Sequence, residues 1–289
     1  MYRFNRARNI VVALILALLA GCSDDTPETA SQAAPAPERQ SASATPAAQP
    51  ALLPEAMAVA AEGLPYGELE DGLLRGYFAY PEAMLSPLPG VILVHDWNGV
   101  DEATRAAAER IAGQGFMVLA VDLYGGQAVT DREVAGRLSR ELIEAPEKVA
   151  ANLAAAQRFL RDGAGAPSVG TFGWAMGGYW SFSASRLLPD PPAASVVLYG
   201  QVDQDAERLA ALQAPVLTVF AENDPSMPLD MIRAYEAEGV AQGKTLEVLV
   251  VPETRAGFAD TGNAAFDEAA AATAWAAVFS FLAEHLPRG

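Results

Sequence analysis

The sequence is short of cysteine, histidine and positive charge. Its 289 residues include one cysteine, Cys22, and two histidines, His95 and His285. A single cysteine excludes an internal disulfide framework. The 19 Lys and Arg residues stand against 36 Asp and Glu residues, for a formal charge of −17. Nucleic acid and anionic membrane surfaces are therefore poor electrostatic partners. With 51% hydrophobic and 19% charged residues, the composition suits one medium-sized globular domain with additional segments.

The N-terminus has the pattern of a secretory signal. Three arginines within the first eight residues precede an apolar run from Ile10 to Ala20, which is short for a membrane span. Leu19-Ala20-Gly21-Cys22 then resembles the bacterial lipobox, whose cysteine is acylated and becomes the mature N-terminus. We expect residues 1–21 to be a lipoprotein signal peptide and acylated Cys22 to anchor the protein to a lipid bilayer. An uncleaved anchor helix is the alternative.

The next segment has the composition of a tether. From Ser23 to about Pro54 the chain is dominated by Ala, Pro, Ser, Thr and Gln. Such a sequence buries too little apolar surface to offset the entropy of ordering it. Residues 22–54 are therefore expected to be a disordered tether that holds the following domain away from the bilayer. The resulting localisation is the bacterial cell envelope, with the domain facing the periplasm or the exterior. Ser23 after the cysteine leans towards the outer membrane by analogy with enteric sorting.

Residues 55–289 alternate between strand and helix patterns. A hairpin is predicted over Gly67 to Tyr80 because alternating residues flank a Glu-Asp-Gly turn. Short apolar runs, typical of strands buried on both faces of a parallel sheet, then alternate with helical periodicity. The expected strands are 91–94, 116–121, 168–172, 195–199, 216–221 and 246–251, and the expected helices are 101–114, 146–161, 178–188, 205–212, 229–238 and 264–286. This order predicts an α/β domain with a mostly parallel sheet covered by helices on both faces.

A strand-to-helix turn at Gly173-Trp174-Ala175-Met176-Gly177-Gly178 is the centre of this domain. A sharp turn of the form G-x-Nuc-x-G is the nucleophile elbow of α/β-hydrolases. Its glycines allow the strand and helix backbones to approach closely. The central residue is Ser or Cys in an active enzyme, whereas here it is Ala175. A methyl group cannot attack a carbonyl carbon.

The sequence of this turn resembles that of the dienelactone hydrolase family, in which the elbow has the sequence G-[aromatic]-C-x-G-G. Two further stretches match the family in order, His95-Asp96-Trp97-Asn98-Gly99 and Asp122-Leu123-Tyr124. The resemblance covers about residues 65–287. It implies the α/β-hydrolase fold, and the family's chemistry is hydrolysis of carboxylic esters and lactones without a cofactor or a metal.

The resemblance also implies roles for the residues around the elbow. In the family, two backbone N–H groups form the oxyanion hole, and their positions are Trp97 and Met176 here. The acidic residue at the position of Asp96 interacts with the resting thiol, a role that Ala175 leaves without a partner. A histidine at the position of His95 is structural in the family.

Two further loops carry the remaining positions of the family's catalytic triad. Asp224, in Asn223-Asp224-Pro225, matches the acid that orients the catalytic histidine. The family's histidine follows a proline by four residues and precedes small-Phe. Counting from Pro252, or back from Phe258, gives Ala256. Both the nucleophile and the general base are therefore expected to be alanine.

The ligand implied by these positions is small and apolar or ester-like. Dienelactone-specific members hold the substrate carboxylate with arginines, whereas the matching positions here are Gly126 and Asp260. Together with Trp97, aromatic residues at the strand ends predict an aromatic-lined cleft, namely Trp174, Tyr124 and Phe258. The sequence defines no oligomeric state.

Three interpretations follow from these residues. The first is a dienelactone hydrolase-family lipoprotein that has lost hydrolysis, a pseudoenzyme that keeps a ligand- or partner-binding role. The second is an active ester or thioester hydrolase with a displaced nucleophile, for which Ser181 and Thr254 are candidates. The third is a deliberately inactivated variant, since paired alanines at a Cys and a His position are typical of engineered inactivation.

Overall fold

The computed structural model describes residues 55–83, 86–126 and 129–289. The described residues all belong to one compact unit, residues 48–289. The expected signal peptide, Cys22 and the tether lie outside the described residues, so they remain expectations. Within the described ranges, no helix has both the length and the apolar character needed to cross a bilayer.

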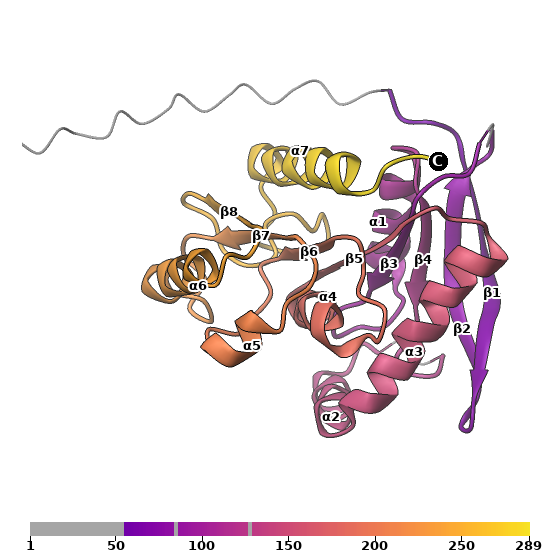
Figure 1. Ribbon diagram of the computed structural model, residues 1–289, viewed down its shortest axis with the longest axis horizontal. Coiled ribbons are helices and arrows are strands. Elements are labelled where there is room, and N and C mark those ends of the chain that lie inside the picture. Colours follow the sequence, from indigo (N-terminus) through magenta and orange to yellow (C-terminus); the bar gives the residue numbers. More distant parts are fainter. Residues whose placement is uncertain (1–54, 84–85, 127–128) are drawn as a thin grey trace, which may run out of the picture. The chain divides into compact units, whose positions relative to one another are not determined.

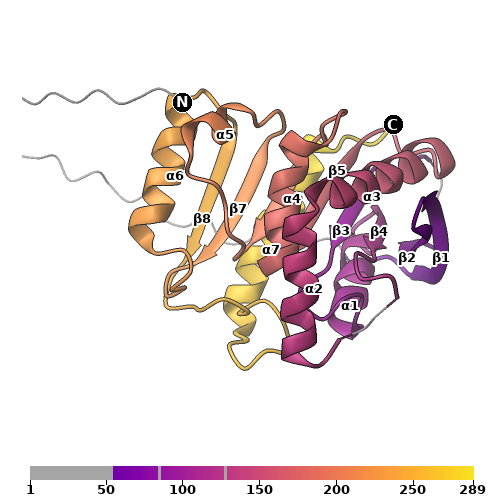
Figure 2. The same ribbon diagram turned by 90° about the horizontal axis from the view of Figure 1, so that it is seen from below.

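The centre of the domain is one eight-stranded sheet with the order β1-β2-β4-β3-β5-β6-β7-β8. The strands are β1 (Val59–Leu69), β2 (Gly72–Pro81), β3 (Gly90–Val94), β4 (Met117–Val121), β5 (Val169–Trp174), β6 (Ser195–Leu198), β7 (Val216–Ala221) and β8 (Leu246–Val251). The β1–β2 hairpin pairs antiparallel to β4, and the other strands are parallel. The hairpin and β8 form the two edges (Figure 2). The predicted parallel sheet is therefore confirmed.

The central strands are apolar throughout because helices cover both of their faces. Every residue of β3, β4, β5, β6 and β7 is buried. Continuous apolar runs are what a parallel sheet requires, since neither face meets water. The carboxyl ends of the parallel strands all lie at the same end of the sheet. The loops that follow β3, β5, β6, β7 and β8 therefore come together there.

Helices lie on both faces of this sheet (Figure 1). They are α1 (Glu102–Ala112), α2 (Arg132–Glu144), α3 (Pro146–Arg158), α4 (Ala175–Leu187), α5 (Ala206–Ala210), α6 (Leu229–Ala241) and α7 (Glu268–His285). α1 and α7 bury their apolar residues against one face, and α3, α4 and α6 pack against the other. Four helices begin at an aspartate whose side chain accepts a hydrogen bond from a first-turn N–H, namely Asp101, Asp131, Asp205 and Asp267.

The structure corrects several details of the expected elements. The hairpin begins at Val59 rather than Gly67, and α4 begins at Ala175 rather than at 178. Helix α2 was not expected, although Asp131 caps it and Ala135 and Leu138 are buried. The helix expected over 146–161 changes after Arg158 into a π-helical turn, η1 (Phe159–Gly163). The last helix begins at Glu268 rather than near 264, because Asp267 provides its N-cap.

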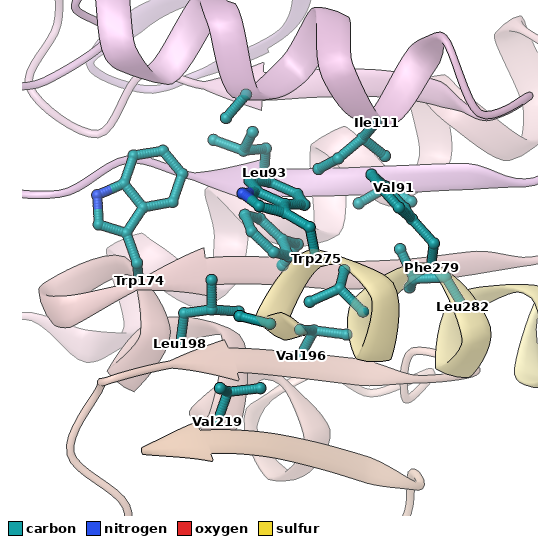
Figure 3. Close-up of a cluster of buried hydrophobic side chains, with 14 of the residues drawn as sticks. Val91, Leu93, Ile111, Trp174, Val196, Leu198, Val219, Trp275, Phe279 and Leu282 are labelled. Atoms are coloured by element: carbon teal, nitrogen blue, oxygen red, sulfur yellow. The ribbon is translucent and has the colours of Figure 1, made fainter. Parts of the chain in front are cut away.

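The largest core cluster lies between the sheet and the pair α1 and α7. Figure 3 shows Trp275 of α7 among Val91, Leu93 and Ile111, with Trp174 to one side. Trp275 stacks on Phe172 of β5 at a ring-centroid distance of 5.4 Å. Aromatic packing therefore fixes α7 against the strand that leads into the elbow.

Candidate functional site: the elbow and the surrounding loops

The turn between β5 and α4 has the geometry of a nucleophile elbow. Ala175 is the first residue of α4 and has φ 48°, in the left-handed region. A Cβ atom on Gly173 would overlap the carbonyl of Gly177, and one on Gly177 would overlap the carbonyl of Val94. Left-handed backbone on a residue with a Cβ costs about 1–3 kcal/mol. The fold therefore maintains a strained elbow although the residue at its tip is a methyl group.

Two backbone N–H groups at the elbow act on one carboxylate. The Met176 N–H donates to Oδ1 of Asp96 at 3.2 Å, and the Trp97 N–H stabilises the charge of the same carboxylate. These are the two N–H groups expected to form the oxyanion hole. The site is able to bind negative charge, as an oxyanion hole must, but here a side chain of the protein supplies that charge.

Burial of the Asp96 carboxyl raises its pKa to about 6. The N–H groups of Trp97 and Met176 oppose this shift, because they stabilise the charged form. The negative charges of Asp101 and Asp260 add to the rise. Asp96 is therefore a carboxyl group that titrates close to neutral pH beside the elbow.

Both ring nitrogens of His95 have hydrogen-bond partners within the protein. Its side chain is fully buried, and its Nε2 accepts the Leu123 N–H at 3.0 Å. Nδ1 therefore carries the proton and donates to the Asp96 carbonyl at 2.7 Å. Burial lowers the pKa of the imidazole, so it is held neutral, and the ring lies 4.7 Å from that of Tyr124. With both nitrogens engaged, His95 joins two loops.

The loops after β7 and β8 carry Asp224 and Ala256. Asp224 is buried, and its Oδ1 accepts the N–H of Ser226 at 2.8 Å and its hydroxyl at 2.7 Å. The neighbouring Asn223 N–H donates to the Thr254 carbonyl at 2.9 Å, which joins the two loops. Ala256 lies exposed in the second loop. The carboxylate of Asp224 is therefore held in place by a serine two residues away.

The two hydroxyl groups considered as displaced nucleophiles are both buried. The Ser181 hydroxyl is in contact with the Val196 carbonyl and the Thr171 hydroxyl, each at 2.9 Å. The Thr254 hydroxyl donates to the Val251 carbonyl at 2.8 Å. Both side chains are within the protein interior. Neither hydroxyl is presented to a ligand at the elbow.

The expected aromatic lining is only partly at a cavity. Trp174 lines a cavity beside the elbow, and Tyr124 is buried with its hydroxyl 3.4 Å from Sδ of Met176. Burial and the charge of Asp96 raise the pKa of Tyr124 to about 12. Phe258 differs from the expectation, because it is fully buried in the core. Trp97 is 40% exposed and does not line this cavity.

Tyr199 is a site residue that the sequence reasoning missed. It follows β6 directly, with φ 35°, and its ring packs edge-on against Phe258 at 5.4 Å. Burial, with the charges of Asp260 and Asp96, raises its pKa far above the usual value. Its place at the carboxyl end of a buried strand was the available signal.

Within the described part of the chain, one group of side chains has the arrangement to hold a metal ion. Ligand atoms of Glu247, Glu284 and His285 lie within 4.8 Å of one another. They belong to β8 and to the C-terminal end of α7. None of them belongs to the loops that form the elbow site.

A strained elbow at the end of a central parallel strand, with paired N–H donors beside it, defines an α/β-hydrolase fold. The chain belongs to the dienelactone hydrolase family, whose family model matches residues 74–286. It is 30% identical over 234 residues to "Putative carboxymethylenebutenolidase" of Methylorubrum extorquens, covering 73% of this chain and 78% of that protein. It is 29% identical over 223 residues to "Protein usf" of Aquifex pyrophilus, covering 74% and 94%.

Solved structures agree on the fold. A crystal structure of a dienelactone hydrolase-like promiscuous phosphotriesterase from metagenomic libraries superposes with a TM-score of 0.71 at 22% identity. The match covers 80% of this chain and all of that one. At this identity the likeness supports the arrangement of strands and helices, and the chemistry has to be argued from the residues at the elbow.

Proposed function

We propose that this protein is a dienelactone hydrolase-family member that has lost ester and lactone hydrolysis at its elbow and keeps a binding role for a small apolar or ester-like ligand, or for a partner. The observation that carries the proposal is Ala175, a methyl group at the strained tip of the elbow. A covalent mechanism needs a nucleophile there, and a base to activate it. The names of the relatives indicate lactone hydrolysis as the chemistry from which this site descends.

Three further observations support a loss of hydrolysis. Ala256 supplies no base in the loop after β8. The hydroxyl of Ser226 bonds the carboxylate of Asp224, which in an active site would orient an imidazole. The Met176 N–H donates to Asp96 and the Trp97 N–H stabilises the same carboxylate, so a substrate carbonyl would have to displace a carboxylate to reach them. Nucleophile, base and oxyanion stabilisation are each affected.

Rescue of activity tests this proposal directly. The double variant Ala175→Cys with Ala256→His places a thiol at the tip of the elbow and an imidazole in the loop that is hydrogen-bonded to the loop of Asp224. We expect saturable hydrolysis of p-nitrophenyl acetate by the double variant, at least about tenfold above the wild-type chain. Adding Asp224→Asn to the double variant should reduce the gain. A folded double variant that stays at the buffer rate would contradict the proposal that only these groups are missing.

The alternative is an active hydrolase with a displaced catalytic group. One observation favours it: Asp96 beside the elbow has a pKa raised to about 6, suited to a general base for a water molecule. In that case the wild-type chain itself should turn over p-nitrophenyl acetate with saturation. Asp96→Asn should then abolish the turnover. A wild-type rate equal to that of buffer would end this alternative.

We also propose that the protein is a lipoprotein of the bacterial cell envelope, anchored through Cys22. The support is the charged start, the apolar run and Leu19-Ala20-Gly21-Cys22. In a bacterial host, metabolic labelling with an alkyne fatty acid should mark the wild-type protein. Cys22→Ser should remove the label, and labelling that persists would exclude this residue as the anchor.

A further inference from the structure

A cavity of about 100 Å³ lies between α1 and α7, beside the elbow. Its α1 wall consists of Ala103, Ala106, Ala107 and Arg110, which share one face of the helix because they are spaced by three and four residues. Three of these side chains are single methyl groups, and they leave room opposite Trp275 of α7. The small residues of α1 therefore create the space, and Arg110 supplies its positive charge.

The remaining walls are mostly apolar. Trp174 and Leu198, from the ends of β5 and β6, line the cavity together with Tyr199 and Trp275. Figure 3 shows Trp275 next to Leu93 with Trp174 to one side of both, and the indole nitrogen of Trp275 is directed towards the side on which Trp174 lies. An apolar body of a few carbon atoms fits between two aromatic walls of this kind.

Two donors at this cavity lack an acceptor. Arg110 has no hydrogen-bond or ion-pair partner among the described residues, and its guanidinium lies 4.5 Å from the centre of the Trp275 ring. Burial lowers the pKa of Arg110. The Trp275 Nε1–H is buried and has no partner within the same ranges. The Arg110 side chain is exposed at the mouth of the cavity, so water reaches its guanidinium. The Trp275 N–H is buried, and because an unpaired buried donor is costly it would gain from an acceptor in the cavity.

The one acidic side chain among the lining residues lies at the other end of the cavity. Asp260 acts electrostatically on Asp96 and Tyr199, which places its charge near the carboxyl ends of the parallel strands. α1 starts at this end of the sheet. Arg110 lies seven residues after Ala103, which is a rise of about 10 Å along the helix axis at 1.5 Å per residue. A ligand can therefore place its anion near Arg110 and keep it away from Asp260.

We propose that this cavity binds a small carboxylate, with its anionic group on Arg110 and the Trp275 Nε1–H and its apolar body extending towards Trp174. The guanidinium lies over the ring that carries the indole N–H, so one carboxylate group can bond both donors. The cavity shares Trp174 with the elbow, but its two donors lie on α1 and α7, so this binding does not depend on whether the elbow hydrolyses esters.

The test uses hexanoate as the probe, with the full-length purified chain. Isothermal titration calorimetry should show saturable binding, accompanied by a change in tryptophan emission because Trp174 and Trp275 form the walls. Hexanamide, which lacks the charge, should bind at least about tenfold more weakly, as should hexanoate to Arg110→Gln. Ala106→Leu should weaken binding as well, because it fills the space.

Arg105→Gln is the matched control. Arg105 lies on the same helix, over the ring of Tyr77 at 5.4 Å, and does not line this cavity. We expect Arg105→Gln to bind hexanoate as the wild-type chain does, and circular dichroism melts should show that each variant is folded. The proposal is overturned by a lack of saturable binding, by equal affinity for hexanamide, or by a folded Arg110→Gln variant that keeps its affinity.

Discussion

At the scale of single residues, Asp96 combines an anionic side chain with a half-buried position at the elbow. Its native pKa of about 6 lies above the value of about 3.9 for an unfolded aspartate. The native state therefore holds this proton more tightly than the unfolded chain does. The resulting stability is fully present below about pH 4 and is lost as the pH rises through about 6.

Asp96→Asn removes this titration and keeps the shape of the side chain. Relative to the wild-type chain, we expect the variant to gain up to about 3 kcal/mol in the free energy of unfolding between about pH 4 and about pH 7.5, at 1.36 kcal/mol per pKa unit. Urea unfolding at several pH values measures the difference. Glu236→Gln, on the exposed side of α6, should show no such trend. A flat difference for Asp96→Asn would mean that this carboxyl is not buried as described.

Ala175 allows the strain of the elbow to be measured separately from its chemistry. Because φ is 48°, Ala175→Gly should relieve part of a cost of about 1–3 kcal/mol, against a loss of up to about 1 kcal/mol from greater unfolded-state freedom. We expect it to be neutral or to stabilise by about 1 kcal/mol. The same change at exposed Ala237, within α6, should destabilise by about 1 kcal/mol. Thermal and urea unfolding compare the two, and equal losses would argue against a strained elbow.

At the scale of elements, the close contact of α4 with β3 requires a residue without a side chain at Gly177. A Cβ on Gly177 would overlap the carbonyl of Val94, so Gly177→Ala must push the first turn of α4 away from the sheet. We expect a loss of about 3 kcal/mol or more in the free energy of unfolding. Gly136→Ala, in the interior of α2, meets only the end of the Arg140 side chain at 3.6 Å. It should stabilise by about 1 kcal/mol, and chemical unfolding of both variants gives the contrast.

How much of this arrangement the sequence could predict also differs by element. The buried strands were predictable because each is a continuous apolar run. The elbow was predictable because Gly173 and Gly177 indicate a close approach of the strand and helix backbones. α2 was missed although Asp131 and its buried positions were present, because Gly136 in its interior weakens a helical pattern. The acceptor for the Met176 N–H was not predictable, because it depends on how Asp96 packs. The cavity of Arg110 and Trp275 was not predictable either, because it forms between α1 and α7, two helices that are far apart in the sequence.

At the scale of the whole molecule, the outer strand of the hairpin has to be joined to the part that matches the family. β1 (Val59–Leu69) precedes the matched residues 74–286. The buried Tyr66 hydroxyl donates to Oδ1 of Asn152 in α3 at 2.6 Å, and the Asn152 amide donates to the Asp122 carbonyl at 3.3 Å. One buried side chain therefore connects the hairpin, α3 and the loop after β4. By contrast, the Lys148–Asp71 ion pair between the same regions is exposed and is screened by water.

Removal of the Tyr66 hydroxyl tests whether this connection holds the hairpin in place. Tyr66→Phe leaves Oδ1 of Asn152 buried without its donor, and we expect a loss of about 1–3 kcal/mol in the free energy of unfolding. Tyr80→Phe is the matched control, because the structure records no hydrogen bond of the Tyr80 hydroxyl within the described ranges and its ring still packs on Phe78 at 5.0 Å. Hydrogen exchange should locate the loss in β1 and in the middle of α3, where Asn152 lies. If both variants lose the same stability, the hairpin is held by strand pairing alone.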